Sequence, residues 1–451
     1  MVTYLNEVFI KKFLLLIFGY LLAISCSAAS AAFQQTVTQT QPFYPSTPYD
    51  LNLVYLSRAS SQGPTELHLA QVNVLNKRTV LDSRLLNNLS PSLYNTMSHI
   101  APDNTLTIAL PVSQIPDITI VTLPQGDIAK MITQKISLPG NLLETEILYD
   151  SISAEYYLVT INLSPLNNQN AATLSLFKKT PAVPQFVPIG TPVVISLTGG
   201  FTSEFAATLD TTNRQIQVMY YPQPNIFSGN PLPPAPEIMS IDLNGNIVVP
   251  AIALPTTTNP AYSNDRFNSL KQGNLNASHL TMAEPINIQT DPRGISFLYK
   301  SSAGTWVNYL SFPQAYFAHQ LMASNNQSGY IAVDINSLVC NFGICLPIRN
   351  TIDLYDGLLI NNQWSWTKNT VYTVPNNARV GGFNLSDSVY ALPNSAIYNL
   401  AVAFTEYDAA NQKFSVKLIL GHNSNLQKWN TVVISLPQLP LYTIEPLWQK
   451  K

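Results

Sequence analysis

The stretch Ile136-Ser137-Leu138-Pro139 is one of seven versions of a short phrase in which two mostly apolar residues flank a third residue and proline usually follows. The fourth residues of these phrases serve as markers, and they are Asp82, Pro139, Thr198, Pro255, Pro313, Pro375 and Pro437. Successive markers lie 57, 59, 57, 58, 62 and 62 residues apart. Near-constant spacing over seven copies indicates a repeat architecture. Each phrase predicts the end of a strand, because proline cannot donate a hydrogen bond to a sheet.

The units between the markers contain strands with broadly alternating apolar and polar residues. In the third unit this pattern predicts four strands, at residues 145–151, 156–163, 172–178 and 192–197. In the second unit it predicts a last strand at residues 128–139, and in the fifth unit it predicts only three strands. The first unit lacks an innermost strand, whereas residues 441–448 form one strand after the last marker. Four strands in a unit of this length are typical of propeller blades. We therefore expect an all-β, seven-bladed β-propeller that is closed by the C-terminal strand completing the first blade.

The second unit carries a resemblance to a known class of repeat. Ala101-Pro102-Asp103-Asn104-Thr105-Leu106 stands before a strand, and a further strand pattern follows at residues 117–123. This arrangement is similar to that of YVTN-type bacterial propeller repeat proteins. The likeness extends over residues 50–448 and implies a propeller fold, without implying a specific family.

The N-terminus has the features of a secretory signal peptide. Lys11-Lys12 precede an apolar run at residues 13–24, and Ala29-Ser30-Ala31 fits a cleavage site. The apolar run is shorter than the about 20 residues that cross a membrane as a helix. We predict a secreted or periplasmic protein with a signal peptide at residues 1–31, a lead-in segment at 32–49 and the propeller at 50–451.

Cys26 leaves an alternative localisation open. Ala23-Ile24-Ser25-Cys26 resembles the processing site of bacterial lipoproteins, although the usual leucine three residues before the cysteine is replaced by Ala23. Lipidation of Cys26 would make the protein a membrane-anchored lipoprotein. A membrane is an expected partner only in that case.

The two remaining cysteines form the motif Cys340-Asn341-Phe342-Gly343-Ile344-Cys345. In an oxidising compartment an even pair of this kind predicts a disulfide between Cys340 and Cys345. Free thiols and a metal site are the alternatives, but two thiolates without nearby histidines or further cysteines leave the coordination of a metal half empty.

Composition excludes some functions. Charged residues make up 11% of the chain, where about 25% is ordinary, and the net charge is −2. The basic residues form no run longer than a pair such as Lys178-Lys179 or the terminal Lys450-Lys451, so we expect no nucleic-acid partner. Sequence signatures of nucleophilic hydrolases, zinc proteases, phosphate-binding loops and EF-hands are absent. These absences favour a binding protein over an enzyme.

Two segments interrupt the strand pattern and are candidate contact loops. Residues 222–236 are rich in proline, and residues 256–277 form an insertion before the fifth unit. Loops on a rigid scaffold are where such folds place recognition. We therefore expect a binding or protein-interaction scaffold that contacts a protein or glycan partner through these loops. The alternative is a hydrolase of sugars or lactones with a carboxylate and metal site at the mouth of the central tunnel.

Four glutamates motivate this alternative, because they stand at similar distances behind a marker. Glu146 follows Pro139 by 7 residues, Glu204 follows Thr198 by 6, Glu445 follows Pro437 by 8, and Glu284 follows Pro255 by 29, of which 22 belong to the insertion. On innermost strands these side chains would converge at one mouth of the tunnel and bind Ca²⁺ or a polar ligand. Offsets of 6, 7 and 8 place side chains on alternate faces unless bulges correct them. The other interpretation is that these glutamates are solvated in a water-filled tunnel.

Aromatic residues also recur at the markers. Trp306, Trp366 and Trp429 precede their markers by 7, 9 and 8 residues. Packing between blades is the simpler explanation, and stacking on sugar rings is the alternative. The five histidines have no metal-ligand spacing, and we expect them at the surface or in strands.

Overall fold

The computed structural model describes the greater part of the chain between residues 51 and 448. The described ranges are 51–58, 64–74, 78–89, 97–111, 115–150, 152–166, 169–196, 205–210, 213–220, 237–253, 271–272, 279–284, 294–300, 306–313, 315–322, 328–341, 344–360, 363–375, 378–387, 400–408, 410–411, 413–422, 425–434, 436 and 440–448. The predicted signal peptide, the lead-in segment and Cys26 lie outside these ranges, as do the candidate contact loop at residues 222–236 and most of the insertion at 256–277.

The described residues form seven four-stranded sheets, which we call A to G in chain order. Sheet A holds β28 (Pro440–Trp448), β1 (Leu51–Arg58), β2 (Thr65–Asn73) and β3 (Arg78–Leu89). Sheet B holds β4 (Met97–Ile100), β5 (Leu106–Pro111), β6 (Asp117–Leu123) and β7 (Ile132–Ser137), with the single-turn 3-10 helices η1 (Pro124–Gly126) and η2 (Ile128–Lys130) before β7. Sheet C holds β8 (Asn141–Asp150), β9 (Glu155–Leu166), β10 (Gln169–Lys179) and β11 (Val187–Ser196).

The remaining sheets repeat the same plan. Sheet D holds β12 (Phe205–Asp210), β13 (Gln215–Tyr220), β14 (Glu237–Asp242) and β15 (Ile247–Ala253). Sheet E holds β16 (Lys271–Gln272), β17 (His279–Glu284), β18 (Gly294–Lys300) and β19 (Trp306–Pro313). Sheet F holds β20 (Ala315–Met322), β21 (Ser328–Asn341), β22 (Ile344–Ile360) and β23 (Gln363–Thr373). Sheet G holds β24 (Ala378–Asp387), β25 (Leu400–Asp408), β26 (Lys413–His422) and β27 (Asn425–Ile434).

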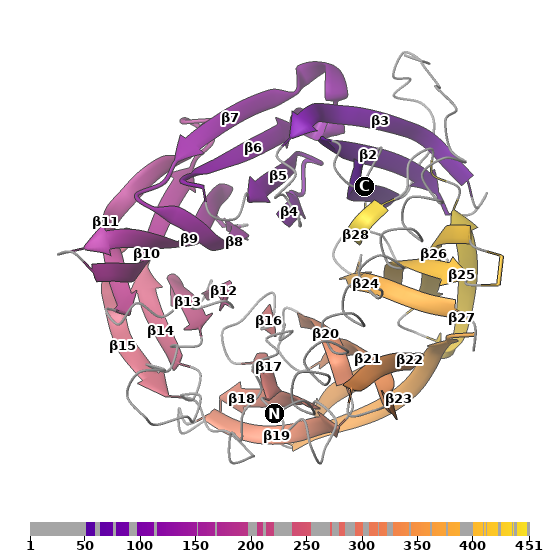
Figure 1. Ribbon diagram of the computed structural model, residues 1–451. Coiled ribbons are helices and arrows are strands. Elements are labelled where there is room, and N and C mark those ends of the chain that lie inside the picture. The colour runs from indigo at the N-terminus through magenta and orange to yellow at the C-terminus, as the bar shows by residue number, and fades with distance from the viewer. Residues whose placement is uncertain are drawn as a thin grey trace, which may run out of the picture.

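The sheets are arranged around a common axis, as Figure 1 shows. All strand pairs within them are antiparallel, and each sheet runs from a strand near the axis to a strand at the outside. The innermost strand of each sheet lies against the innermost strands of both neighbouring sheets, and β28 in this way contacts β4 and β24. Repeated four-stranded sheets around an axis define a β-propeller.

The helices among the described residues are single turns, and none of them could span a membrane.

Sheet A is assembled from both ends of the described chain. β28, which the repeat pattern left without a unit, pairs antiparallel with β1, from Leu51 opposite Trp448 to Ser57 opposite Pro440. The strand order is therefore β28-β1-β2-β3, with the C-terminal strand in the innermost position.

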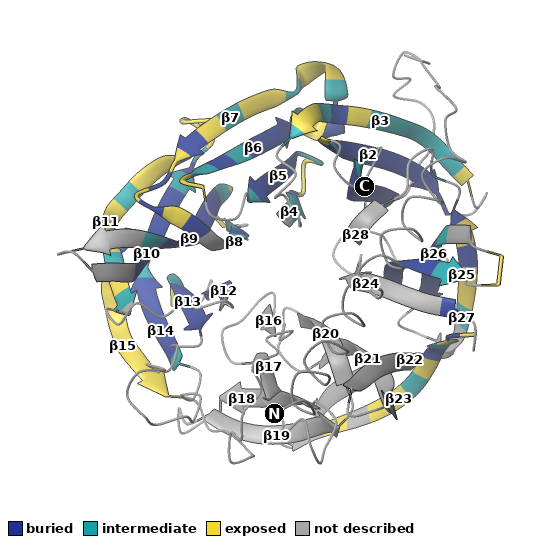
Figure 2. Cartoon of the chain, viewed as in Figure 1, coloured by how far each residue is buried: buried dark blue, intermediate teal, exposed yellow. Residues whose placement is uncertain are grey.

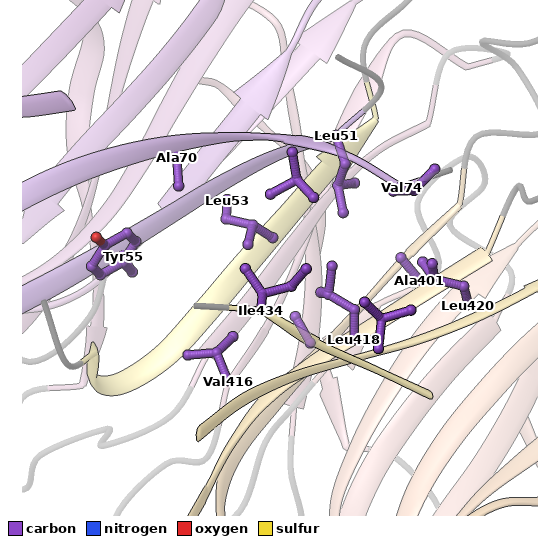
Figure 3. Close-up of a cluster of buried hydrophobic side chains, with 13 residues drawn as sticks. Leu51, Leu53, Tyr55, Ala70, Val74, Ala401, Val416, Leu418, Leu420 and Ile434 are labelled. Atoms are coloured by element: carbon purple, nitrogen blue, oxygen red, sulfur yellow. The ribbon is translucent and has the colours of Figure 1, made fainter. Parts of the chain in front are cut away.

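The core of the described residues lies between neighbouring sheets, and sheets A, B, C and G bury apolar residues on both faces. On one face of β1, Leu51, Leu53 and Tyr55 pack against sheet G, where Ala401 and Leu418 belong to the same cluster (Figure 3). On the other face, Val54 and Leu56 pack with residues of sheet B such as Leu106, Ile108 and Val121. Strands that are buried on both faces need apolar residues at almost every position, which explains why alternation is weak in the middle strands.

Burial falls from the middle strands to the outermost strands, as Figure 2 shows. β1 and β5 are buried along nearly their whole length, whereas β15 is exposed at all seven residues. The outermost strands therefore form the side wall of the molecule.

Two sequence-based assignments differ from the structure. The fifth unit was expected to have three strands, but β16 supplies a fourth inside the segment 256–277 that we took for an insertion. A strand of two polar residues carries no alternation, and so no pattern could indicate it. In the second unit, the single strand expected at residues 128–139 is the 3-10 helix η2 followed by the shorter strand β7.

Candidate functional site

The structure describes the strands that carry three of the four candidate glutamates, and their convergence at one mouth of the tunnel stays a prediction. Glu146 is half-buried on β8, the innermost strand of sheet C, and Glu445 lies on β28, the innermost strand of sheet A. Sheet B stands between these two sheets in chain order. Glu204 lies outside the described residues.

Glu284 is placed differently from the expectation. It ends β17, where its backbone pairs with Gly294, and β17 is the second strand of sheet E because β16 takes the innermost position. The expectation that Glu284 lies on an innermost strand is therefore wrong, and the reason is the undetected strand β16. Among the described residues, no group of three or more histidine, cysteine, aspartate or glutamate side chains could hold a metal ion. A Ca²⁺ site made by these glutamates remains a prediction.

The described structure instead gathers aromatic and basic side chains at the boundary of sheets B and C. His99 of β4 stacks on Tyr149 of β8, with ring centroids 5.1 Å apart and planes inclined by 27°. Tyr156 of β9 lies 4.8 Å from Tyr149 and 5.8 Å from His99, centroid to centroid. Because β4 and β8 are the innermost strands of sheets B and C, His99 and Tyr149 come from the strands nearest the axis.

Lys179 of β10 completes the group from the same boundary. Its Nζ donates a hydrogen bond to Thr122 Oγ1 of β6 at 3.1 Å, and it lies 5.0 Å from the ring centroid of Tyr156 and 5.9 Å from that of Phe186. Burial lowers the pKa of Lys179 to about 8, because desolvation disfavours the charged amine and outweighs the opposing effect of Asp103. Burial also raises the pKa of Tyr156. The amine is therefore stabilised by aromatic faces and a hydroxyl rather than by a close carboxylate.

Sequence reasoning missed Lys179, because it treated Lys178-Lys179 only as a short basic run. Adjacent residues of a strand point to opposite faces, and this rule was a usable signal. Lys178 forms an ion pair with Glu155 of its own sheet at 2.8 Å, whereas Lys179 reaches across to sheet B. Lys178 and Lys179 therefore point to opposite faces of β10, and Lys179 enters the interface with sheet B.

A second feature is the exposed apolar surface on the outside of sheets C and D. Every residue of β15 is exposed, and its sequence Ile247-Val248-Val249-Pro250-Ala251-Ile252-Ala253 has no polar side chain. Ile247, Val248, Val249 and Ile252 have between 40% and 51% of their surface exposed, and Val187 and Val194 of β11 have 42% each. We call these six residues the outer apolar surface.

β11 and the turn before β15 touch each other at two glycines. Gly190 and Gly245 both have positive φ angles, +66° and +89°. A Cβ atom on Gly190 would lie 2.8 Å from the carbonyl oxygen of Asn244, which is closer than real Cβ contacts allow. The close approach of the two backbones joins the exposed strands of sheets C and D. Together, β11 and β15 contain no charged residue.

No family model and no curated protein matches this sequence. Among solved structures, the chain is similar to the β-propeller domain of the Trilobed protease from Pyrococcus furiosus, at 8% identity and a TM-score of 0.46, over 86% of this chain and 93% of that chain. It is also similar to the polysaccharide lyase Uly1, at 9% identity and a TM-score of 0.43, over 88% of this chain and 95% of that chain. A third similar structure is the α-L-arabinofuranosidase Arb93A from Fusarium graminearum, at 10% identity and a TM-score of 0.43, over 75% of this chain and 95% of that chain.

Lys179 predicts a distinctive pH dependence of stability. Its folded pKa of about 8 lies below its ordinary value of 10.5, so between these pH values the unfolded chain binds the proton that the folded protein releases. The free energy of unfolding should therefore rise with pH from about 8, by at most about 1.4 kcal/mol per pH unit. Chemical denaturation between pH 7.5 and 9.5 would measure this rise.

Lys179→Met should abolish this component of the rise, and Lys178→Met should retain it. A wild-type protein and a Lys179→Met variant with parallel stability curves over this pH range would show that the amine keeps its ordinary titration in the fold.

Proposed function

We propose that this chain is an exported, seven-bladed β-propeller, closed by β28 in the first blade, and that it acts as a protein-binding scaffold through its outer apolar surface. The observation that carries the proposal is β15, a strand whose seven residues are all apolar and all exposed. Soluble monomers rarely expose large contiguous apolar patches, and such patches usually mark interaction sites.

Three findings support the closed ring. The described strands form seven four-stranded sheets, β28 pairs with β1, and the innermost strands contact one another from sheet to sheet around the axis. A rigid ring would hold the outer apolar surface in a fixed shape, which lowers the entropy lost on binding.

The chemistry of the surface favours a protein partner that binds through side chains. It lacks the positive charge that a nucleic acid requires. Pro188 and Pro192 in β11 and Pro250 in β15 have no backbone N–H, so these edges are poor templates for an added strand. The pairing of β14 with β15 is also interrupted by two register shifts. A partner would therefore contact the apolar side chains and would extend no ladder of backbone hydrogen bonds.

The candidate contact loop at residues 222–236 is a further part of the proposal. The strands that flank it, β13 and β14, end in a direct pair in which the hydroxyl of Tyr220 donates to Glu237 at 2.9 Å. This part-buried bond fixes the base of the connection. A protein or glycan partner would engage this segment and residues 256–277, and export rests on the signal features of residues 1–31.

The second candidate function is a hydrolase of sugars or lactones with a Ca²⁺ site near the axis. The specific observation in its favour is that Glu146 and Glu445 both belong to innermost strands. Differential scanning calorimetry of the full chain with and without Ca²⁺ separates the two candidates. The hydrolase predicts a Ca²⁺-dependent rise in melting temperature that Glu146→Gln removes, and the scaffold predicts no such rise.

Photo-crosslinking in expressing cells tests the scaffold. A photoreactive amino acid at Val249 should give a defined crosslinked protein adduct, because this side chain lies in the outer apolar surface. The same amino acid at Val433 provides the control, since Val433 is an exposed valine of the outermost strand of sheet G.

A combined Ile247→Thr and Ile252→Thr change should lower the adduct yield at Val249 about tenfold, because two lost apolar anchors weaken a contact by more than 1.4 kcal/mol. The melting temperature should change little, because these residues are exposed in the folded protein. Equal adducts from positions 249 and 433, or none from either, would contradict the proposed surface.

A further inference from the structure

β21 and β22 extend well past the sheet to which they belong. β20 pairs with β21 only as far as Ile335, and β23 pairs with β22 only from Thr351 onward. Between these limits the two strands pair, among the described residues, with each other alone, in direct pairs that run from Asn336 opposite Arg349 to Asn341 opposite Ile344. We call residues 336–341 and 344–349 the hairpin arm.

Cys340 and Cys345 are direct partners in the hairpin arm. The Cα atoms of directly opposed residues in antiparallel strands lie about 4.5 or 5.5 Å apart, depending on the type of pair. A disulfide needs a Cα separation of about 4.4–6.8 Å, and both types of pair satisfy this requirement. The nearest register shift lies between Ile335 and Asn336, so the pairing is regular through the two cysteines.

The sequence contains only one other cysteine that could compete as a partner. The third cysteine of the chain, Cys26, belongs to the predicted signal peptide. The hairpin arm also needs an additional constraint, because a two-stranded hairpin without further strands is marginally stable in water. A covalent bond between opposed residues supplies that constraint by restricting the unfolded arm.

We infer that Cys340 and Cys345 form an intramolecular disulfide that staples the hairpin arm. One thiolate attacks a disulfide oxidant, such as an oxidoreductase or oxidised glutathione, and forms a mixed disulfide. The second thiolate then displaces the thiol of the oxidant. The two cysteines lose two protons and two electrons, and the oxidant is reduced to two thiols.

The pairing pattern predicts a local consequence of reduction. Since residues 336–341 and 344–349 pair with no third strand among the described residues, the hairpin arm can open while the four-stranded part of sheet F stays paired. The disulfide is independent of the outer apolar surface, which belongs to sheets C and D. Failure of the photo-crosslinking experiment would therefore leave this inference untouched.

The experiment uses the full chain, oxidised with glutathione disulfide and compared with the same protein after reduction. Peptide mapping without reductant should recover one linked species that joins Cys340 to Cys345, lighter by two hydrogens. Backbone amides of residues 338–346 should exchange with solvent deuterium at least tenfold faster after reduction. Amides of β25 and β26 should exchange at unchanged rates.

The double variant Cys340→Ser with Cys345→Ser should exchange like the reduced protein under both conditions, and Cys26→Ser should behave like the wild type. Full alkylation of both thiols after oxidation would overturn the inference. Linkage of either cysteine to Cys26, or exchange in residues 338–346 that does not respond to reduction, would overturn it as well.

Discussion

The pairing of β28 with β1 is the constraint on which the rest of the structure depends. It gives sheet A the innermost strand that the first unit does not encode, and it places the C-terminal strand beside β24 and β25 of sheet G. Leu51, Leu53 and Tyr55 are then held against Ala403 and Leu418, in a cluster of residues that are each almost fully buried. Sheets A, B, C and G each bury two apolar faces, and a sheet at an open end of the array would leave one of them in water. The closed ring that we propose would remove both ends.

Polar contacts add specificity at the sheet boundaries. At the boundary of sheets F and G, Lys417 lies 2.5 Å from Glu406 and 2.6 Å from the hydroxyl of Tyr372, which itself donates to Glu406. At the boundary of C and D, Arg214 forms an ion pair with the buried carboxylate of Asp150. Buried charges are tolerated when they are paired, and each pair favours one neighbour over the alternatives. Burial opposes charge on Lys417, but its bonds to Glu406 and Tyr372 raise its pKa, whereas Lys179 has no such carboxylate and its pKa falls.

The repeat could be predicted from the sequence because the outermost strands β7, β11, β15, β19, β23 and β27 end at or shortly before their markers. The first phrase is the exception, since β3 continues past Asp82 to Leu89. The strand at residues 441–448 could be predicted because the first unit lacks an innermost strand and these residues follow the last marker. β16 could not, because Lys271-Gln272 is too short and too polar to show a period. Trp429 packs against the cluster of sheets F and G, over Gly421, where a Cβ atom would lie 2.4 Å from its ring, and this placement agrees with the packing explanation for that tryptophan. Trp306 and Trp366 have no described side chains.

The candidate site was harder to predict than the fold. Marker distances count residues along the chain, but convergence of side chains depends on strand order and bulges. Because β16 was not predicted, Glu284 lies on the second strand of sheet E and not on the innermost one. A bulge between Leu142 and Glu144 also shifts the register of β8 just before Glu146. The exposed face of β15 could not be predicted either, because Ile247-Val248-Val249 has the composition of a buried strand.

An engineered crosslink between the two ends of the chain tests the central claim most directly. Asn52 and Leu447 are direct partners across β1 and β28. A protein with Asn52→Cys and Leu447→Cys should form a disulfide between these positions under mild oxidation, identified by peptide mapping and with a native melting transition. Asn52→Cys with Leu441→Cys should form none, because position 441 is six residues further along β28, about 20 Å away. A yield for the first pair no higher than for the second would contradict the closed ring.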